Sequence, residues 1–236
     1  MWLAIETATD LASVALGDPG AILAEEALTG ARQHAAGLLP MVLRALVTAE
    51  ATLEEVEGVV VADGPGSFTG LRVGASVGKA LVHARGLPLW TAPSLMGLAL
   101  GAAAPGESLV LAVSDALRGE VYASAFRFHP ARVETVLDPS VFTPAGLMER
   151  LALPAVIVGT LPAPVREPLE AWSGLEVRAA APRASDLLRL IGQHGGARRV
   201  AAPADWEPEY GRPAEAQTKW EQAHGRRLPD SAGLPR

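Results

Sequence analysis

Residues 64–74 form the part of this chain whose residue types and spacing could most directly do chemistry. They read GPGSFTGLRVG and follow an apolar run that ends at Ala62. Glycine adopts positive φ and lets a ligand or another backbone come close, and N–H groups near Ser67, Phe68 and Thr69 at a helix start can face an anion. The segment therefore predicts either an anion-binding turn or a tight strand-to-helix turn whose glycines only allow close packing. The candidate residues of this glycine loop are Gly64, Gly66, Ser67, Thr69, Gly70 and Arg72.

Two nucleotide-binding templates are not met by the glycine loop. The dinucleotide fingerprint G-x-G-x-x-G needs a third glycine where Thr69 stands. The P-loop pattern fails because the stretch from Gly74 to Lys79 is one residue short, and because Ala80 replaces the hydroxyl that binds Mg²⁺. An independent ATP-dependent phosphotransferase or ATPase nevertheless stays an alternative that sequence alone leaves open.

A serine-type peptidase is a second alternative, with Ser67 as the nucleophile. A nucleophile elbow reads G-x-S-x-G, and here Pro65 and Thr69 occupy the two glycine positions. The histidine of a catalytic triad can come from anywhere in the chain, so this mismatch disfavours the peptidase without excluding it.

Composition and charge narrow the class of protein. The chain has 236 residues, is 49% hydrophobic and contains no cysteine, so it can bury a substantial core without disulfides or a thiolate nucleophile. Its net charge is −6, and residues 1–110 hold 11 acidic against 5 basic side chains. An acidic half of this kind should repel nucleic acid, so strong tRNA binding by this chain alone is not expected. No apolar run is long enough for a membrane span, and we expect a cytoplasmic protein.

Hydrophobic periodicity and turn residues predict alternating strands and helices. Strands are expected at residues 3–6, 12–16, 21–27, 59–62, 88–91, 111–115, 121–128 and 155–158. Helices are expected at residues 33–49, 71–85, 95–103, 144–151 and 185–194, with a capping box at Thr52–Glu55 before a further short turn. The second half repeats the strand-turn-strand plan of the first, which predicts a duplicated α/β fold with its halves face to face.

The predicted division of the chain falls near residue 104. Residues 1–103 would form an N-terminal lobe that carries the glycine loop, and residues 104–236 a smaller C-terminal lobe. The tail of this second lobe is rich in Pro, Arg and Glu and is expected to be disordered beyond about His224.

Five segments together resemble the TsaB (YeaZ) family. They are Ile5-Glu6-Thr7-Ala8, the glycine loop with Gly78 following, Thr91 to Ser94, the segment from Asp115 through Arg118 and Glu120 to Tyr122, and Tyr210-Gly211-Arg212 with Glu215-Ala216. The likeness covers about residues 1–220, and the glycine loop is its most specific motif. The chain departs from the family at Gly211, where the family usually has Leu.

The resemblance implies a duplicated actin-like, sugar-kinase-like ATPase fold with a degenerate nucleotide site. It also implies a non-catalytic subunit that supports the catalytic paralogue TsaD, together with the small ATPase TsaE, in transferring a threonylcarbamoyl group to adenosine 37 of tRNA. On this basis we expect a homodimer when the chain is alone, tRNA contact only through the complex, and no cofactor bound by this chain alone. Whether ATP or ADP lies at a shared interface stays open.

Two observations agree with a supporting role. Actin-like ATPases hold phosphate and Mg²⁺ at an Asp-x-Gly turn after the first strand, and this chain has Glu6-Thr7-Ala8 there, without the glycine that lets phosphate come close. The paralogue's metal site needs paired histidines on a helix, whereas the five histidines here are isolated in sequence. We therefore expect no catalytic residue and no metal ligand. The histidines are His34, His83, His129, His194 and His224.

The first two predicted helices are the expected contact with a partner. The first carries one charge in residues 35–47, so it is apolar nearly all round, and the second has glycines at every fourth position along one face. The resemblance places both helices against TsaD or a second copy of this chain, and the alternative is that the lobe's own sheet covers these faces. The predicted interface residues are Leu38, Leu39, Val42, Leu46, Gly74, Val77, Gly78 and Leu81.

Overall fold

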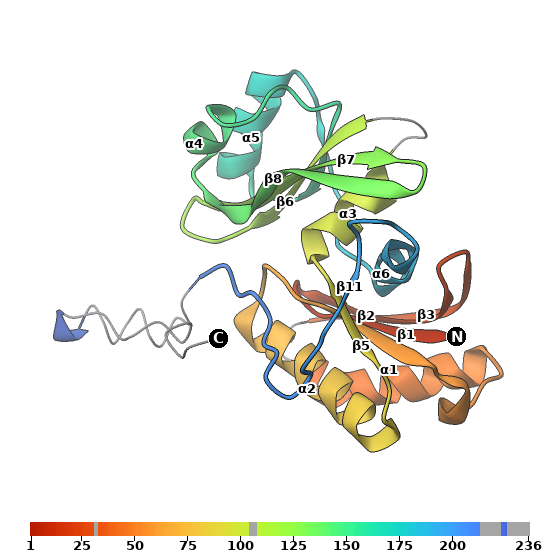
Figure 1. Cartoon of the computed structure of the whole chain (residues 1–236). Helices are drawn as coiled ribbons and strands as arrows, with labels where there is room; N and C mark the ends of the chain where they lie inside the picture. The colour runs from red at the N-terminus through yellow and green to blue at the C-terminus, as the bar shows by residue number, and fades with distance from the viewer. Residues whose placement is uncertain (31–32, 104–107, 213–222, 226–236) are drawn as a thin grey trace.

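The chain folds into two stacked α/β lobes, seen one above the other in Figure 1. The computed structural model describes residues 1–30, 33–103, 108–212 and 223–225. The predicted disorder beyond His224 concerns residues that, Gly225 apart, lie outside this described part. Among the described residues, no helix is both long enough and apolar enough to cross a membrane.

The first lobe is a mixed sheet with strand order β11-β5-β4-β1-β2-β3. The hairpin of β1 and β2 is antiparallel, whereas β4 runs parallel to β1 and β5 parallel to β4. Every residue of β4 is buried, as expected for a strand covered on both faces. The elements up to residue 102 are β1 (Trp2–Glu6), β2 (Leu11–Asp18), β3 (Ala21–Thr29), α1 (His34–Thr48), the 3₁₀ turn η2 (Leu53–Glu55), β4 (Gly58–Ala62), α2 (Phe68–Arg85), β5 (Leu89–Ala92) and α3 (Ser94–Ala102).

The second lobe repeats this plan. Its sheet has the order β10-β9-β6-β7-β8, in which the β6–β7 hairpin corresponds to β1–β2 and the parallel strand β9 to β4. The same order of strands in both halves confirms the duplicated α/β fold predicted from the sequence. The remaining elements are β6 (Ser108–Asp115), β7 (Val121–His129), β8 (Arg132–Phe142), α4 (Pro144–Met148), β9 (Val156–Thr160), α5 (Ala163–Ser173), β10 (Val177–Arg178), α6 (Ala184–Ile191) and β11 (Arg198–Arg199).

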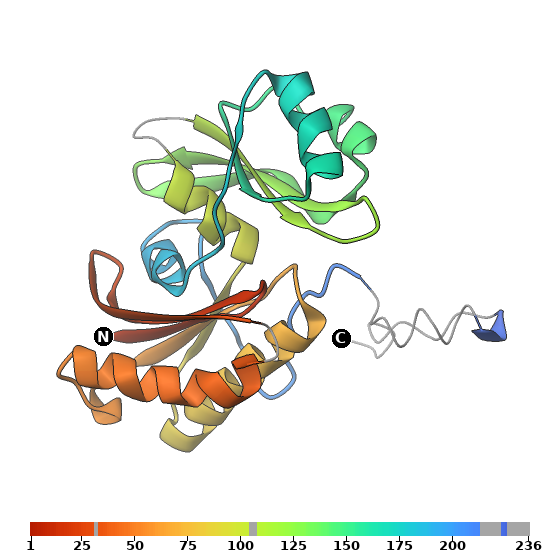
Figure 2. The ribbon, with the colours of Figure 1, turned by 180° about the vertical axis from the view of Figure 1, so that it is seen from behind.

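Helices cover both sheets and fill the space between them. Helices α1 and α2 lie on the outer face of the first sheet, and α4 and α5 on the outer face of the second (Figures 1 and 2). Between the sheets, α3 packs on β6 and β7 of the second lobe, while α6 packs on β1 and β2 of the first. One apolar cluster joins residues of both sheets through these two helices, so the lobes share a continuous core.

The end of the described chain returns to the first lobe. Strand β11 pairs antiparallel with β5 at the edge of the first sheet. The predicted boundary near residue 104 thus separates the two hairpin plans, but α6, β11 and the segment that follows them are built onto the first lobe. This return brings residues 209–212 beside the glycine loop, where the candidate site lies.

Candidate functional site

The glycine loop follows β4 after Asp63 and leads into α2. The Ser67 hydroxyl accepts a hydrogen bond from the Gly70 N–H at 3.2 Å and so caps the helix. The Ser67 N–H donates to the carbonyl oxygen of Ala8 at 2.7 Å. Of the N–H groups that could face an anion, that of Ser67 is therefore already occupied, because the turn between β1 and β2 accepts its hydrogen bond. The hydroxyl's position as a helix cap also accounts for Ser67 without a nucleophilic role.

The glycines of this loop allow other backbone to approach. A Cβ at Gly66 would collide with the carbonyl oxygen of Ala8, and a Cβ at Gly70 with that of Thr7. Gly64 has φ 101° and contacts the carbonyl of Glu209. Close packing, the second of the two readings of this loop, is the one that the structure bears out.

Two buried carboxyl groups lie at the carboxyl ends of neighbouring parallel strands. Glu6 ends β1 and is fully buried; its Oε1 accepts hydrogen bonds from the Ala8 N–H at 2.7 Å and from the Ser94 hydroxyl at 3.2 Å, while its Oε2 has no partner among the described residues. Burial raises the pKa of Glu6 to about 7. The side chain thus caps the turn after β1 while its carboxyl group is shielded from solvent.

Asp63, which follows β4, is a functional candidate that the sequence analysis missed. Its Oδ2 accepts a hydrogen bond from Arg198 Nη2 at 2.9 Å, and Arg198 Nη2 also lies 3.7 Å from Oε1 of Glu209. Burial raises the pKa of Asp63 to about 6, and the Arg198 charge opposes that rise. An acid directly after a fully apolar strand was the available signal, because such a residue stands at the edge where parallel strands present their carboxyl ends.

The second-lobe motif forms the tight turn between β6 and β7. The Asp115 Oδ1 accepts a hydrogen bond from the Leu117 N–H at 2.8 Å, and three successive residues have positive φ, 62° at Leu117, 57° at Arg118 and 79° at Gly119. Left-handed backbone is costly for leucine and arginine. The turn is closed by hydrogen bonds from the Ala116 N–H to the Glu120 carbonyl at 3.0 Å and from the Glu120 N–H to the Leu117 carbonyl at 3.1 Å. It exposes Arg118 and two-thirds of the Leu117 side chain.

Tyr210 and Arg212 together contact both the glycine loop and the turn between β6 and β7. The Tyr210 ring packs on Phe68 of the glycine loop with 4.5 Å between ring centroids, and Arg72 Nε donates to the Tyr210 hydroxyl at 3.3 Å. On the other side, Arg212 pairs with Glu120 of the second-lobe turn. The structure therefore gathers motif segments from residues 5 to 212 at one place between the lobes.

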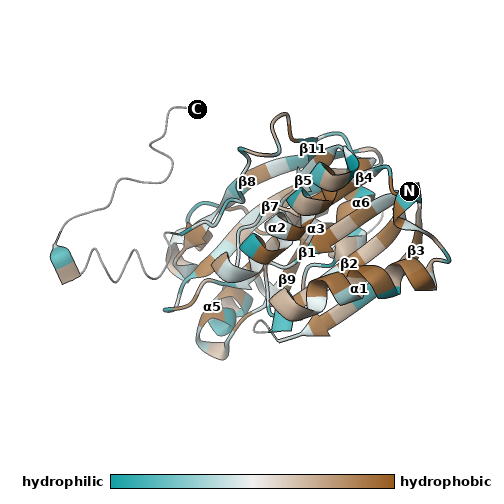
Figure 3. Ribbon diagram, turned by 90° about the horizontal axis from the view of Figure 1, so that it is seen from below, coloured by the Kyte–Doolittle hydropathy of each residue, from teal (hydrophilic) through white to brown (hydrophobic). Residues whose placement is uncertain are grey.

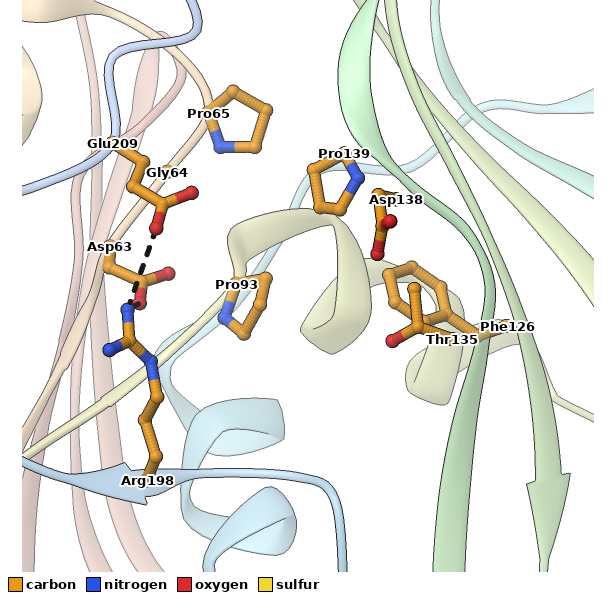
Figure 4. A pocket seen from close by; sticks show the side chains of 10 residues that line it. All are labelled: Asp63, Gly64, Pro65, Pro93, Phe126, Thr135, Asp138, Pro139, Arg198 and Glu209. Atoms are coloured by element: carbon orange, nitrogen blue, oxygen red, sulfur yellow. Dashed lines mark hydrogen bonds and ion pairs between the residues drawn. The ribbon is translucent and has the colours of Figure 1, made fainter.

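A pocket of about 270 Å³ lies at this junction, shown in Figure 4. Asp63, Arg198 and Glu209 lie on one side of it, and Asp138 faces them from β8. Three carboxyl-bearing residues against one arginine give the lining an acidic balance, which disfavours a polyphosphate. The other lining residues are Gly64, Pro65, Pro93, Phe126, Thr135 and Pro139.

The sequence predicts no metal ligand among the histidines. His34 is buried near the start of α1, where its Nε2 lies 3.1 Å from the carbonyl oxygen of Asp10. Within the described ranges, histidines and acids form no group of three or more that could hold a metal ion.

The predicted partner face of α1 and α2 needs a correction. Several of the eight residues face the lobe's own sheet, so the expectation that they are exposed in the free monomer is wrong for Leu38, Val42, Leu46, Gly74 and Gly78. Helical periodicity cannot tell which of two apolar faces covers the sheet. At the second helix, a Cβ on Gly74 would meet the Thr7 side chain and one on Gly78 the Val61 side chain, so these glycines let α2 approach its own sheet.

The remaining interface candidates lie elsewhere on the same helices. Val77 and Leu81 are partly buried against the core between α1, α2 and the sheet, and Leu39 is 53% exposed. Leu43 and Val47 follow Leu39 at four-residue intervals along α1, and they are 64% and 78% exposed. We call these three residues the apolar strip; α1, which carries it, is mostly brown in Figure 3.

Comparison with known proteins finds relatives named for the threonylcarbamoylation of tRNA. Residues 21–181 match the family described as TsaD: tRNA N6-adenosine threonylcarbamoyltransferase. The tRNA threonylcarbamoyladenosine biosynthesis protein TsaB of Escherichia coli K12 is 34% identical over 224 residues, which cover 88% of this chain and 93% of that protein. The protein of the same name from Bacillus subtilis 168 is 28% identical over 92% of this chain and 96% of its own length. The solved structure of YeaZ from Pseudomonas aeruginosa is 31% identical with a TM-score of 0.67, covering 81% of this chain and 91% of that one.

Proposed function

Because the chain belongs to the TsaB family, we propose that it serves as a non-catalytic subunit in the biosynthesis of threonylcarbamoyladenosine in tRNA. In this proposal it binds a TsaD-like catalytic paralogue in the cytoplasm, and a TsaE-like ATPase joins the assembly. The complex transfers a threonylcarbamoyl group to adenosine 37 of tRNA, and tRNA contacts the chain only through the complex. Alone, the chain forms a homodimer. Any ATP or ADP binds at an interface that the chain shares with a partner.

The observation that carries this proposal is the apolar strip on α1. Leu39, Leu43 and Val47 are spaced by four residues, so they form one row along the outer side of the helix. The opposite side of α1 already packs on the first sheet through Leu38, Met41 and other residues. A row of large exposed apolar side chains is typical of a protein–protein contact, which gives α1 a second face for a partner.

The supporting rather than catalytic role rests on how the glycine loop is occupied. In an actin-like ATPase the turn after β1 holds phosphate, and here the glycine loop packs against that turn at Thr7 and Ala8. The pocket between the lobes has an acidic lining, which repels a triphosphate. Both features favour a chain that acts by binding a partner.

Leu43→Asp tests the proposal, with Leu153→Asp as its matched control. Both leucines are about equally exposed, 64% and 62%, but Leu153 lies in the second lobe, away from the apolar strip. Docking would bury Leu43, whose transfer from water stabilises a complex by about 1 to 2 kcal/mol, and a carboxylate there adds a desolvation cost. We therefore expect association with the TsaD-like paralogue to weaken by about tenfold or more.

The measurements are the dissociation constant for the purified paralogue, tRNA modification with all partners present, and the melting temperature of each variant. Leu43→Asp should lose association and modification together while its melting temperature stays near that of the wild type. Leu153→Asp should resemble the wild type in all three. If Leu43→Asp binds the paralogue as tightly as the control does, the assignment of the apolar strip is wrong. If binding is lost but modification is unchanged, the proposed role in tRNA modification is wrong instead.

A further inference from the structure

The segment after β11 is fixed to the first lobe over most of its length. Lys79 of α2 donates a hydrogen bond from Nζ to the carbonyl oxygen of Ala204 at 3.0 Å, and Trp206 packs against the core beneath α1 and α2. Further on, the Glu209 N–H donates to the carbonyl oxygen of Asp63 at 2.6 Å. The chain thus reaches the glycine loop while still bound to the first lobe.

The next three residues contact the second lobe. The Tyr122 hydroxyl of β7 donates to the carbonyl oxygen of Tyr210 at 3.4 Å, and Arg212 forms its ion pair with Glu120. Between them, Gly211 has φ 69°, and a Cβ there would lie 2.7 Å from a ring carbon of Tyr122. Only glycine fits both the left-handed backbone and the contact with the tyrosine ring.

Tyr210 holds both lobes at once. Its ring packs on Phe68 and its hydroxyl accepts from Arg72, whose guanidinium lies 4.1 Å from the centroid of the Phe68 ring. Its carbonyl oxygen accepts from Tyr122 of the other lobe. A side chain bound to one lobe and a backbone group bound to the other make this residue a direct link between them.

The segment links the lobes at the pocket, on the side away from the shared core. The shared core runs through α3 and α6, and Figures 1 and 2 place these helices on one side of the junction and the segment that follows β11 on the other. Glu209 is itself part of the pocket lining. We propose that Trp206–Arg212 is a clasp that fastens the two lobes together at the pocket, and that its release lets the lobes separate on that side.

The contacts with the second lobe are of a kind that can break while the core stays intact. The described contacts include one ion pair, one hydrogen bond, the packing of Gly211 on the Tyr122 ring, and the Arg212 guanidinium 6.0 Å from the centroid of that ring. The two charged side chains are partly exposed, Arg212 by 24% and Glu120 by 38%. Regions held by few, partly solvated contacts open locally far more often than the whole protein unfolds. The first-lobe contacts of the segment would remain when the second-lobe contacts break.

A distance measurement between the lobes tests the clasp. The chain has no cysteine, so Ala80→Cys on α2 and Ala171→Cys on α5 place two spin labels on exposed sites of opposite lobes. Pulsed electron resonance then gives the distribution of distances within the full chain when the labelled protein is mixed with an excess of unlabelled protein, because distances between the two copies of a homodimer would otherwise contribute. The variant to compare is Tyr122→Phe combined with Arg212→Ala, which removes the hydrogen bond and the ion pair. Arg44→Ala is the matched control, because it breaks an ion pair with Glu26 inside the first lobe.

We expect one narrow distribution for the otherwise unaltered chain and for Arg44→Ala. The clasp variant should show a broader distribution with an added population that is longer by more than about 2 Å, the size of ordinary domain rearrangements. Gly211→Ala provides a second, smaller change that should shift the distribution in the same direction, because its Cβ displaces the Tyr122 ring. Unchanged distributions in both variants would overturn the proposal, and so would a shift of equal size in Arg44→Ala.

Discussion

Replacing Glu6 by glutamine should make the stability of this protein less dependent on pH. The carboxyl group of Glu6 is fully buried and has one oxygen without a described partner. Glutamine has nearly the same shape, and its carbonyl oxygen can accept the hydrogen bonds that Ala8 and Ser94 now donate to Oε1. The substitution therefore removes the titration and keeps the packing.

The direction follows from the proton binding of the two states. The pKa of Glu6 rises from 4.5 to about 7 on folding, so between these values the folded state binds more protons than the unfolded state. The contribution of Glu6 to the free energy of unfolding is full below about pH 4.5, falls as pH rises, and is lost above about pH 7. At roughly 1.4 kcal/mol per unit, this amounts to about 2.5 kcal/mol between pH 5 and pH 8. In a chain of this size it corresponds to about 5 to 10 °C in melting temperature.

The assay is the melting temperature of wild type and Glu6→Gln at several values between pH 5 and pH 8. Asp63, whose pKa is also raised, lowers stability with rising pH in both proteins, so its own contribution largely cancels in the difference. Glu6→Gln should gain on the wild type steadily across the range, whereas Glu176→Gln, which alters an exposed carboxyl group, should follow the wild type. Parallel pH profiles for Glu6→Gln and wild type would refute the reasoning, because they would mean that Glu6 does not take up a proton on folding.

Two further predictions concern the glycine loop and RNA. Gly70→Ala should lower the melting temperature by several degrees, because its Cβ would collide with the Thr7 carbonyl. In the control Gly174→Ala a Cβ meets no atom within 4 Å, so only the positive φ of that residue should lower the melting temperature. Equal losses in melting temperature would contradict the packing role of Gly70. The isolated chain, with net charge −6, should bind tRNA no more tightly than about 10⁻⁴ to 10⁻⁶ M at physiological salt, which filter binding measures and which nanomolar affinity would disprove.

Local patterns in the sequence predicted most of the elements correctly. The apolar run of β4, the strand-turn-strand plan of both halves and the capping box at Thr52–Glu55 are all present. These features depend on neighbours within a few residues, so they can be recognised without knowing the fold. The start of α2 was placed at residue 71 instead of Phe68, because the Ser67 cap was not recognised.

Strand β8 and helix α5 of the second lobe were not predicted from the sequence because each carries a local signal that favours a break. Strand β8 (Arg132–Phe142) is an edge strand with irregular register and many exposed residues, and Asp138-Pro139 within it reads as a turn. Helix α5 (Ala163–Ser173) contains Pro168 inside the helix, which argues against a helix locally. In both cases the tertiary setting outweighs a local signal that favours a break.

The sequence by itself determined that α1 is apolar on two faces and that glycines follow β4. It could not determine which apolar face lies on the sheet, since a period of 3.6 residues is the same for both. The tertiary structure turned Leu38 inward and Leu43 outward. It also brought Asp63 beside Arg198, and Tyr210 between Phe68 and Tyr122, from positions far apart in the chain. Such pairings arise where strands of one sheet end together and where the chain returns to the first lobe, and neither is visible in local sequence.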